Sequence, residues 1–484
     1  MSLINPAHRA RFALLLALLT VLPTAGAGDD PVLWAQSDEK RFAITAILLE
    51  KALSEGPQRV MIGLNTAFKP EGSLSRAGFS KQRQDISSAQ SAVLAGLAGF
   101  NIQKKRQFKY VPFMVLEADT LAIERLADLP MVASLQEDQV EHLAMASSNE
   151  VIGSPAAWSA GYDGTDWVVA VLDTGVDKTH PYFTTGSKVV SEACYSTTLT
   201  DLSTTVCPNG EQFSVALGSG VNCPLDINGC DHGTHVAGSA TGNDLAGPNY
   251  GVGRGAKIIA IQVFSSIDSD DFCGIGNSPC AGTFPSDQVA ALERVYDLRG
   301  DFNIAAVNMS LGGTIYTDEV SCDDEQQSRK LAIDNLRSVG IATVAASGNS
   351  GRLNGIRTPA CISSSVSVGA TTDLDSIAGF SNVADFLDLL APGFSITSAA
   401  PGGGTSNMSG TSMATPHVAG AWAILKQRSP TAGVARVLTV LRYTGTSVDD
   451  GRTNGTVTDM RRINVDVGLA RLADILFLEG FEDN

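Results

Sequence analysis

The chain has 484 residues, which is enough for a large core and for more than one folded unit. Hydrophobic residues make up 44% and charged residues 18%, a globular balance that excludes wholesale disorder. The formal net charge of −17 argues against nucleic acid as a partner, because phosphate backbones are bound by basic patches.

The N-terminal segment carries the pattern of a secretory signal peptide. Arg9 and Arg11 precede an apolar stretch at 12–22, and the small residues Ala25-Gly26-Ala27 follow it. This order predicts a signal peptide at residues 1–27 and a secreted protein, extracellular or periplasmic. Because the apolar stretch is too short to span about 30 Å of hydrocarbon, the mature form is expected to have no membrane anchor.

All eight cysteines lie between residues 194 and 361. An even number of cysteines in an exported chain predicts disulfides, although the sequence alone leaves many pairings open. Short spacing favours the pairs Cys223–Cys230 and Cys273–Cys280. The remaining pairs would then be Cys194–Cys207 and Cys322–Cys361. A zinc site is disfavoured, because the spacing of Cys223, Cys230 and His232 is not a usual one for that metal.

Residues 28–147 are predicted to form a small α+β domain without cysteine. The expected elements are a strand at 58–66, a helix capped by Asp85, a strand pair or bent strand at 108–118, a helix at 119–130 and a strand at 131–139. This order predicts a small sheet covered by two helices. The small and polar residues at 141–150 predict an exposed linker and cleavage site.

From residue 148 to residue 475, short apolar runs alternate with glycine-rich turns. Buried strands are predicted at 166–175, 256–264, 303–313 and 340–349, with an amphipathic helix at 323–340. Continuous apolar strands that alternate with helices indicate an α/β fold, a parallel sheet with helices on both faces. Ligands of such sheets bind beyond the carboxyl ends of the strands, where the polar motifs lie. Residues 476–484 form a short tail to which no role is assigned.

Four polar residues are candidates for chemistry; three of them lie beside glycine turns, and each has an ordinary structural interpretation. Asp173 and Asn349 are typical turn residues. His232 could be structural or bind a metal, and Ser412 could cap a helix. Together they supply what acyl transfer requires: a hydroxyl nucleophile, a base, a group that orients the base and an oxyanion donor. The combination favours chemistry.

Five motifs carry a resemblance to a known family. They are VAVLDTGVD (169–177), DHGTHVAG (231–238), NMSLGG (308–313), AASGNSG (345–351) and GTSMATPHVAG (410–420). In this Asp, His, Ser order they resemble the subtilisin-like serine proteases, over about residues 150 to 475. Residues 56–142 resemble the inhibitory propeptide of that family.

The resemblance implies a role for each motif residue. Ser412 would attack the scissile carbonyl, His232 would act as general base and then general acid, and Asp173 would orient His232, which completes the catalytic triad. Asn349 would stabilise the oxyanion with its side-chain amide, together with the backbone N–H of Ser412. The extended backbone of Ser310, Leu311 and Gly312 would pair with substrate as an added strand; alternatively it is simply a buried strand followed by a turn. His235 is expected to pack rather than react.

The leading hypothesis is a secreted serine endopeptidase that is made as a self-processing zymogen. Its partners would be peptide or protein substrates and its own propeptide, acting as an intramolecular inhibitor. Two alternatives remain: a peptide ligase or transpeptidase that uses the same acyl-enzyme, and a catalytically silent binding protein with this fold. The segment after Asn349 does not align clearly with the family's specificity loop, so the residue that faces the side chain before the cleaved bond is not identified.

No cofactor is expected for catalysis. Calcium is a common structural ion in this family, and the chain is acidic, so a structural calcium site is compatible with the sequence. No ligand set is assigned, because Asp177, Asp226 and Asp231 look like ordinary surface acids.

Overall fold

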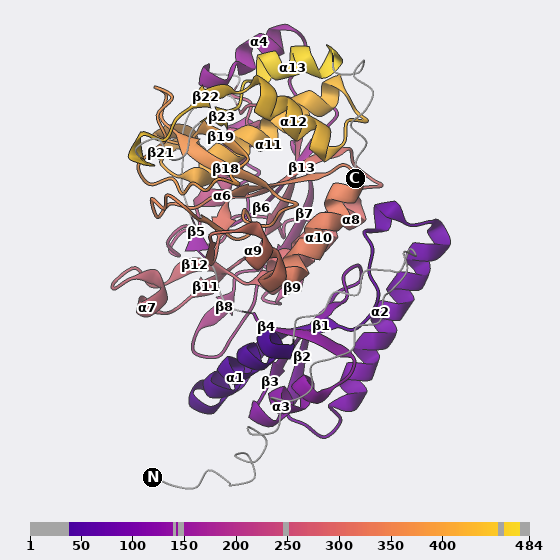
Figure 1. Ribbon diagram of the computed structural model, residues 1–484. Helices are drawn as coiled ribbons and strands as arrows, with labels where there is room; N and C mark the ends of the chain where they lie inside the picture. The colour runs from indigo at the N-terminus through magenta and orange to yellow at the C-terminus, as the bar shows by residue number, and fades with distance from the viewer. Residues whose placement is uncertain (1–37, 139–141, 144–149, 245–250, 454–458, 475–484) are drawn as a thin grey trace. The chain divides into compact units, whose positions relative to one another are not determined.

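The computed structural model describes residues 38–138, 142–143, 150–244, 251–453 and 459–474 (Figure 1). The predicted signal peptide (1–27), most of the predicted linker (141–150) and the tail (476–484) lie outside these residues. No helix in the described part of the chain is long and apolar enough to cross a membrane.

The first lobe contains a four-stranded antiparallel sheet within its described residues, in the order β2-β3-β1-β4. Its elements are α1 (Asp38–Glu55), β1 (Gln58–Leu64), the 3-10 turn η2 (Glu71–Ser73), α2 (Arg76–Gly96), β2 (Ile102–Gln107), β3 (Phe113–Ala118), α3 (Thr120–Asp128) and β4 (Val132–Glu137). Along β1 the side chains alternate: Val60 and Ile62 pack with the helices, whereas Met61 joins the core of the second lobe. One face of the small sheet is therefore covered by its own helices and the other by the second lobe.

Three of the elements expected in this lobe are confirmed. The strands expected at 58–66 and 131–139 are β1 and β4, and Asp119 caps α3 by accepting the Ala122 N–H at 2.9 Å. The long helix, however, begins at Arg76, where Ser75 caps it by accepting the Gly78 N–H at 3.2 Å. Asp85 lies in the middle of that helix. A polar first half hides the helical period there, so the sequence pattern becomes visible only from Asp85 onward.

The region expected as a strand pair at 108–118 is also different. Strand β2 precedes it, residues 108–112 form the turn, and only β3 falls within it. Strand β2 has the sequence IQKKRQ and contains no buried residue, so it lacks the alternation of apolar and polar residues that signals a strand. Helix α1 was not predicted.

The second lobe is built on a large sheet that has ten strands in the described residues. Their order is β22-β23-β19-β18-β16-β13-β6-β10-β7-β9. The strands in chain order are β6 (Val168–Asp173), β7 (Val189–Tyr195), β9 (Phe213–Ser214), β10 (Lys257–Gln262), β13 (Ile304–Met309), β16 (Ala342–Ala346), β18 (Val366–Thr371), β19 (Leu389–Pro392), β22 (Thr446–Val448) and β23 (Met460–Arg462). Pairing from β7 to β23 is parallel, and only β9 and β22 at the described edges run antiparallel.

Helices cover both faces of this sheet, which confirms the predicted fold class (Figure 1). Along β6, Val169 and Val171 pack with α6 (His232–Thr241) and α11 (Thr411–Arg428). The alternate residues Ala170 and Leu172 share a core with α8 (Pro285–Leu298) and α10 (Gln327–Ser338). A strand buried on both sides reads as a continuous apolar run, which is why all four predicted strands are found.

The helix expected at 323–340 is two helices, α9 (Glu319–Glu325) and α10, which meet at Gln326. The other helical segments are η3 (Glu150–Ile152), α4 (Ser154–Ser159), α5 (Pro181–Thr184), α7 (Asp270–Cys273), α12 (Val434–Thr444), η4 (Gly451–Thr453) and α13 (Val465–Asp474). The remaining strands are β5 (His142–Leu143), β8 (Ser203–Thr205), β11 (Phe264–Ile267), β12 (Cys280–Thr283), β14 (Leu311–Gly312), β15 (Ile315–Tyr316), β17 (Ile356–Arg357), β20 (Ile396–Ala400) and β21 (Gly404–Met408).

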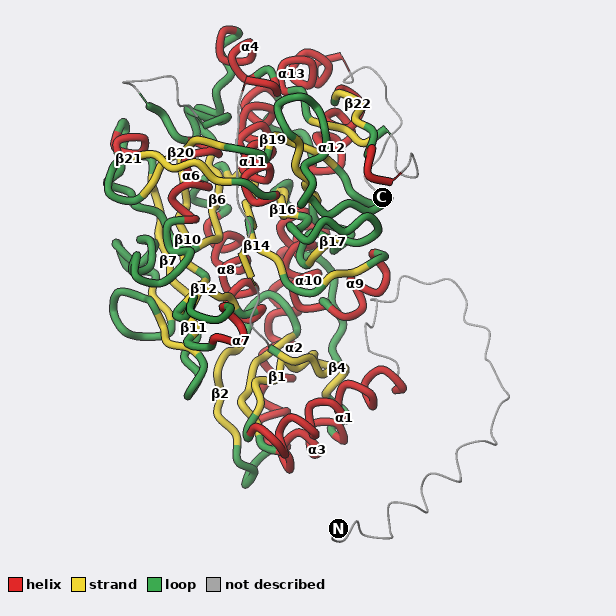
Figure 2. The backbone as a smooth tube through the Cα atoms, turned by 90° about the vertical axis from the view of Figure 1, so that its left-hand side faces the viewer, coloured by secondary structure: helices red, strands yellow, loops and turns green. Residues whose placement is uncertain are grey.

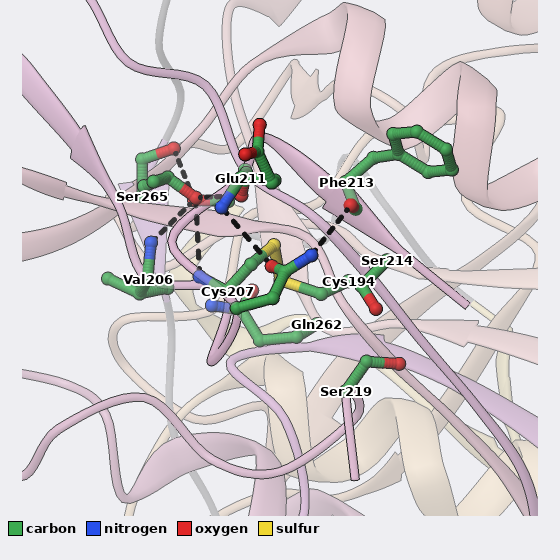
Figure 3. The surroundings of a disulfide bond; sticks show 12 residues. Cys194, Val206, Cys207, Glu211, Phe213, Ser214, Ser219, Gln262 and Ser265 are labelled. Carbon is green, nitrogen blue, oxygen red and sulfur yellow. Dashed lines mark hydrogen bonds between the residues drawn. A yellow bond between two sulfur atoms is a disulfide. The ribbon is translucent and has the colours of Figure 1, made fainter. Parts of the chain in front are cut away.

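The eight cysteines form four disulfides, and all four predicted pairs are confirmed. The Cys194–Cys207 bond ties the end of β7 to the loop that follows it (Figure 3). Next to this bond, the Val206 N–H donates to Ser196 Oγ at 3.0 Å, and that oxygen lies 3.1 Å from Ser265 Oγ. The loop that contains Val206 and Cys207 is thereby fixed to the end of β7 and to Ser265 of β11.

The loops closed by the disulfides differ in length, so their contributions to stability should differ. The Cys322–Cys361 disulfide joins residues that are 39 apart in the chain, whereas the Cys273–Cys280 disulfide joins residues that are 7 apart. Each disulfide is removed by replacing both of its cysteines with alanine. The entropy of loop closure predicts losses in unfolding free energy of about 4 and about 2 kcal/mol, respectively. Urea unfolding of the two double variants measures both. Equal losses would show that loop length does not set the contribution.

Candidate active site

Asp173 and His232 form the buried centre of the site. Asp173 is the last residue of β6 and His232 is the first residue of α6. Asp173 Oδ1 lies 2.7 Å from His232 Nδ1, and both side chains have no solvent exposure. The Thr174 N–H donates to the same carboxylate oxygen at 2.7 Å. A carboxylate at Nδ1 holds the proton on that nitrogen, which leaves Nε2 to accept a proton.

Glycine at position 233 allows this close approach. A Cβ on Gly233 would collide with the carbonyl oxygen of Gly175 and would lie 3.1 Å from Asp173 Oδ1. The Gly233 N–H donates to Thr174 Oγ1 at 2.9 Å. The glycines of the DTG and HGTH motifs therefore let the end of β6 and the start of α6 pack backbone to backbone.

Ser412 is held by Ser310 through two reciprocal hydrogen bonds. It is the second residue of α11, and α6 and α11 lie side by side in both views (Figures 1 and 2). Ser412 Oγ donates to the Ser310 carbonyl at 3.0 Å, and Ser310 Oγ donates to the Ser412 carbonyl at 2.5 Å. Pro416 has no N–H, so it cannot bond to the carbonyl four residues earlier. The Ser310 hydroxyl satisfies that carbonyl instead.

Ser412 is not a capping serine, which was its simplest structural interpretation. Gly410 occupies the N-cap, and no side chain caps α11 there. The first N–H groups of a helix have no partner within it. The Ser412 N–H accordingly has no hydrogen bond to any part of the chain that the structure describes. It is a donor at the positive end of the helix dipole, which suits a developing negative charge.

Asn349 is oriented by the residue that precedes Ser412. Its Oδ1 accepts the Thr411 N–H at 2.8 Å and lies 3.0 Å from Thr411 Oγ1. Thr411 Oγ1 also accepts the Gly348 N–H at 3.0 Å. Because Oδ1 is occupied by these donors, the amide N–H groups of Asn349 point away from Thr411. The half-buried Asn349 amide and the Ser412 N–H are therefore the two donors that the sequence predicted for an oxyanion.

Ser310, Leu311 and Gly312 lie where the chain leaves the end of β13. Leu311 and Gly312 form strand β14, which pairs antiparallel with β5 of the same chain. The pairs are Gly312 with His142 and Leu311 with Leu143. The edge predicted to receive an added strand thus carries the segment that follows the first lobe.

The sequence comparisons give the family. The sequence profile of the subtilase family matches residues 164–458, which is more than half of the chain. The chain belongs to the subtilase family. This assignment rests on a match that contains all four polar residues discussed above.

Individual relatives agree with the subtilase assignment. Subtilisin NAT of Bacillus subtilis subsp. natto is 32% identical over 76% of this chain and 84% of its own length. An alkaline protease of Alkalihalobacillus alcalophilus is 30% identical over 86% of this chain and 95% of its own, and an extracellular serine proteinase of Thermus sp. (strain Rt41A) is 33% identical over 69% and 70%. The chain is accordingly a serine protease of the subtilase family.

A solved structure supports the subtilase fold independently. Fervidolysin from Fervidobacterium pennivorans, a keratinolytic enzyme related to subtilisin, superposes with a TM-score of 0.59 at 20% sequence identity. The match covers 86% of this chain and 61% of the fervidolysin chain, so this subtilase spans about three-fifths of that structure. At this identity the likeness concerns the fold.

His235, the second histidine of the HGTH motif, is placed for packing. Its Nε2 lies 3.1 Å from the Ile396 carbonyl and 3.2 Å from the Ser406 carbonyl. Within the described residues its Nδ1 has no partner. Burial, and to a lesser extent the nearby imidazole of His232, lowers the pKa of His235 to about 3. His235 is therefore a neutral donor to two backbone carbonyls.

No metal centre is evident in the described ranges, where no three His, Cys, Asp or Glu side chains gather in the manner of a ligand set. Asp177, one of the acids considered for calcium, has a structural partner for each oxygen. Its Oδ1 accepts the Thr179 N–H at 3.0 Å, and its Oδ2 accepts the Gly402 N–H at 2.9 Å. Asp177 thus ties two loops together.

The structure joins the predicted residues in pairs: Asp173 to His232, Ser310 to Ser412, and Asn349 to the neighbour of Ser412. The chemical roles assigned to them remain predictions. Sequence reasoning missed two groups, the Ser310 hydroxyl and Thr411. The only available signal for Thr411 was its position in the GTS motif directly before Ser412.

Removing the Asn349 amide should slow turnover far more than it weakens substrate binding. In Asn349→Ala, kcat should fall by roughly 10² to 10³ with little change in KM, because the donor acts on charge that develops in the transition state. Steady-state kinetics on a peptide substrate measures both constants. The control is Asn354→Ala, an exposed asparagine in the following loop. Equal effects in both variants would contradict the assignment.

The depressed pKa of His235 predicts a stability effect with a definite sign. Because the folded-state pKa lies below the unfolded value, protons bind preferentially to the unfolded chain, so His235 favours unfolding as pH falls below about 6.5. His235→Asn should therefore lose less stability than the parent between about pH 6.5 and 4. Thermal unfolding in a Ser412→Ala background measures this. An identical pH dependence would show that folding does not lower the pKa of His235.

Proposed function

We propose that this subtilase is a secreted serine endopeptidase that cleaves peptide bonds through an acyl-enzyme on Ser412. We further propose that it is made as a zymogen, with residues 28–147 as its propeptide and 148–475 as its catalytic domain. The observation that carries the proposal is the pairing of β5 with β14. The chain's own segment lies, as an added strand, on the edge that leads to Ser412.

The chemistry follows from the groups around Ser412. A hydroxyl carries one hydrogen, so Ser412 Oγ must turn from the Ser310 carbonyl for its proton to pass to His232 Nε2. The oxygen then bonds to the substrate carbonyl carbon, and Asp173 stabilises the resulting imidazolium. Asn349 and the Ser412 N–H would bind the oxyanion. His232 next gives its proton to the leaving amine, and water releases the acyl group by the reverse path. Every step uses the protein's own groups, and no cofactor is required.

The pairing register supports substrate binding as an added strand. The pairs step from Gly312 and His142 to Leu311 and Leu143, that is, toward Ser310. The Ser310 carbonyl accepts the Ser412 hydroxyl, so an extended chain on this edge runs toward the nucleophile. The same edge would serve the zymogen's own linker and, after its removal, a substrate.

Contacts between the lobes support an inhibitory role for the first lobe. Glu293 of α8 accepts three backbone N–H groups from the β2–β3 turn, those of Lys109, Tyr110 and Val111, at 3.1, 2.7 and 3.2 Å. Burial raises the pKa of Glu293 to about 7, and the three donors oppose this shift. The turn is thus docked through its backbone on a helix of the second lobe.

A second docking point lies at the start of α8. Asp138, just after β4, accepts the Ser286 N–H at 2.8 Å, and its carboxylate pairs with Arg59 at 2.6 Å. An acid at a helix N-terminus is stabilised by the orphan N–H groups and by the helix dipole. Arg106 pairs with Asp287 at 2.9 Å in the same region. The two edge strands of the first lobe's sheet, β2 and β4, are therefore both anchored near α8, while β5 pairs with β14.

Secretion is supported by three observations. The chain carries four disulfides, which persist in oxidising compartments. Its relatives include an extracellular serine proteinase. The sequence begins with the pattern of a signal peptide.

Self-processing gives a direct test. Ser412→Ala should leave the precursor uncut, whereas the parent should yield a mature chain whose N-terminus falls between Leu143 and Glu150, because β5 ends at Leu143. Intact mass and N-terminal sequencing measure both outcomes. Ser409→Ala, an exposed serine three residues earlier, is the matched control and should process normally. Normal cleavage of the Ser412→Ala precursor in the absence of other proteases would refute autocatalysis.

The processed enzyme can also be used to distinguish the endopeptidase from the two alternative functions, a silent binding protein and a peptide ligase. A fluorophosphonate should label Ser412 of the processed enzyme, and failure to label would favour a silent binding protein. Adding a nucleophilic peptide amine to the reaction distinguishes the ligase from the hydrolase: new amide products in excess over hydrolysis would favour ligation.

A further inference from the structure

A long loop leads from the large sheet to His232, and a disulfide closes the last part of this loop. The loop comprises residues 196–231 and runs from the end of β7 to the start of α6. The disulfide of Figure 3 closes its beginning, whereas the Cys223–Cys230 disulfide closes its end. His232 follows the second of these cysteines by two residues. A shift of the loop would therefore be passed to His232 unless the last part of the loop is fixed.

The first cysteine of this pair is joined to the segment that follows Asp173. The Cys223 N–H donates to the Thr174 carbonyl at 3.0 Å. A Cβ on Gly175 would collide with the Val221 carbonyl, so the two backbones pack with no side chain between them. The position of the first cysteine is thus set by the end of β6.

The second cysteine is joined to His232 by tight turns. The Cys230 N–H donates to the Ile227 carbonyl at 3.2 Å, and the His232 N–H donates to the Gly229 carbonyl at 3.2 Å. Gly229 has a φ of +94°, a conformation that glycine adopts without strain. These turns leave little slack between the second cysteine and the first residue of α6.

The disulfide thereby completes a ring around the buried aspartate and histidine. From Asp173 the ring passes through the Thr174 carbonyl to Cys223. The disulfide then leads to Cys230, and the main chain leads on to His232. The hydrogen bond from His232 Nδ1 to Asp173 Oδ1, at 2.7 Å, closes the ring. Both cysteines are buried, so the ring lies inside the protein, and the disulfide is its covalent cross-connection.

The first turn of α6 is also held by hydrogen bonds between neutral groups. The Gly233 N–H donates to Thr174 Oγ1, and the Asp177 N–H donates to Thr234 Oγ1, each at 2.9 Å. Bonds of this kind add little net stability each, because water can replace either partner. A covalent link does not exchange with water. Since a displacement of about 1 Å can cost about 100-fold in rate, the link matters most for geometry.

We propose that the Cys223–Cys230 disulfide is a positioning element for catalysis, which holds His232 against Asp173. Its effect on the reaction rate rests on the proposed function, whereas its effect on the hydrogen bond does not. Turnover should therefore depend on this disulfide more strongly than folding does.

The two disulfides of the loop provide a matched comparison. The loop-end variant is Cys223→Ala with Cys230→Ala, and the loop-start variant is Cys194→Ala with Cys207→Ala. The loop-start disulfide spans 13 residues and the loop-end disulfide spans 7, so the first should contribute at least as much to stability. Strand β10 separates β7 from β6, so the loop-start disulfide is not part of the ring. Comparison of the two variants separates positioning from stability.

The first test measures the state of His232 and needs no activity. In the Ser412→Ala precursor labelled with ¹⁵N-histidine, NMR at a pH where imidazoles are neutral shows which ring nitrogen carries the proton. His232→Asn assigns the signals. The proton should lie on Nδ1 in this precursor and in its loop-start variant, because the Asp173 carboxylate holds it there. In the loop-end variant it should move partly or wholly to Nε2, and an unchanged proton position would overturn the inference.

The second test measures turnover of the processed enzymes on a peptide substrate. The loop-end variant should lose about 10- to 100-fold in kcat with KM within about threefold, because misplaced groups slow chemistry without removing the binding edge. The loop-start variant should keep both constants within about twofold. Equal losses in the two variants would overturn the inference. A parent enzyme without any activity would remove the proposed function, while the NMR measurement would still decide on the disulfide.

Reduction of the parent decides if the loop-end variant does not fold. The processed enzyme is treated with increasing amounts of a phosphine reductant, its turnover is measured, and the free thiols are then alkylated and located by mass spectrometry. Loss of kcat should follow the appearance of thiols at Cys223 and Cys230. It should not follow those at Cys273 and Cys280, which are only half-buried. Full turnover after reduction of the Cys223–Cys230 pair would overturn the inference.

Discussion

The hydrogen bond between Asp173 and His232 sets the constraint on which the rest of the site depends. Two side chains without solvent exposure can meet at 2.7 Å only if their backbones approach closely. The first must therefore end its strand at the carboxyl edge of the sheet, and the second must begin a helix at that edge. Gly233 removes the side chain that would prevent this contact. The parallel sheet satisfies the geometry because β6 lies between β10 and β13, where crossovers leave in opposite directions.

The reciprocal bonds of Ser310 and Ser412 extend this constraint to the other half of the site. They join the residue after β13 to the first turn of α11, so the position of Ser412 is tied to that of Ser310. Pro416 permits this arrangement because it cannot donate to the Ser412 carbonyl, which accepts the Ser310 hydroxyl instead. Ser310 of the NMSLGG motif therefore contacts Ser412 twice: its hydroxyl donates to the Ser412 carbonyl, and its carbonyl accepts from the Ser412 hydroxyl.

The sequence was most informative where burial is two-sided and least informative where position depends on distant pairing. Strands β6, β10, β13 and β16 are mainly apolar and almost entirely buried, and they were predicted. Strand β2 is polar, so it carried no pattern. Asp173 and His232 lie in motifs with neighbouring glycines, which indicate that two backbone segments approach each other closely. The Ser310 hydroxyl and Thr411 could not be recognised, because a hydroxyl that bridges two segments looks in sequence like one that caps a turn.

Arg357 illustrates the same limit more strongly, because its place is set by pairing between β15 and β17 across some forty residues of chain. Its neighbours in the sequence give no sign of the bonds that it makes to the Gly313 carbonyl and to Ser350 Oγ. The edge at β14 pairs with β5 of the same chain through the backbone, and backbone pairing carries little information about side chains, so the sequence alone could not place this contact either.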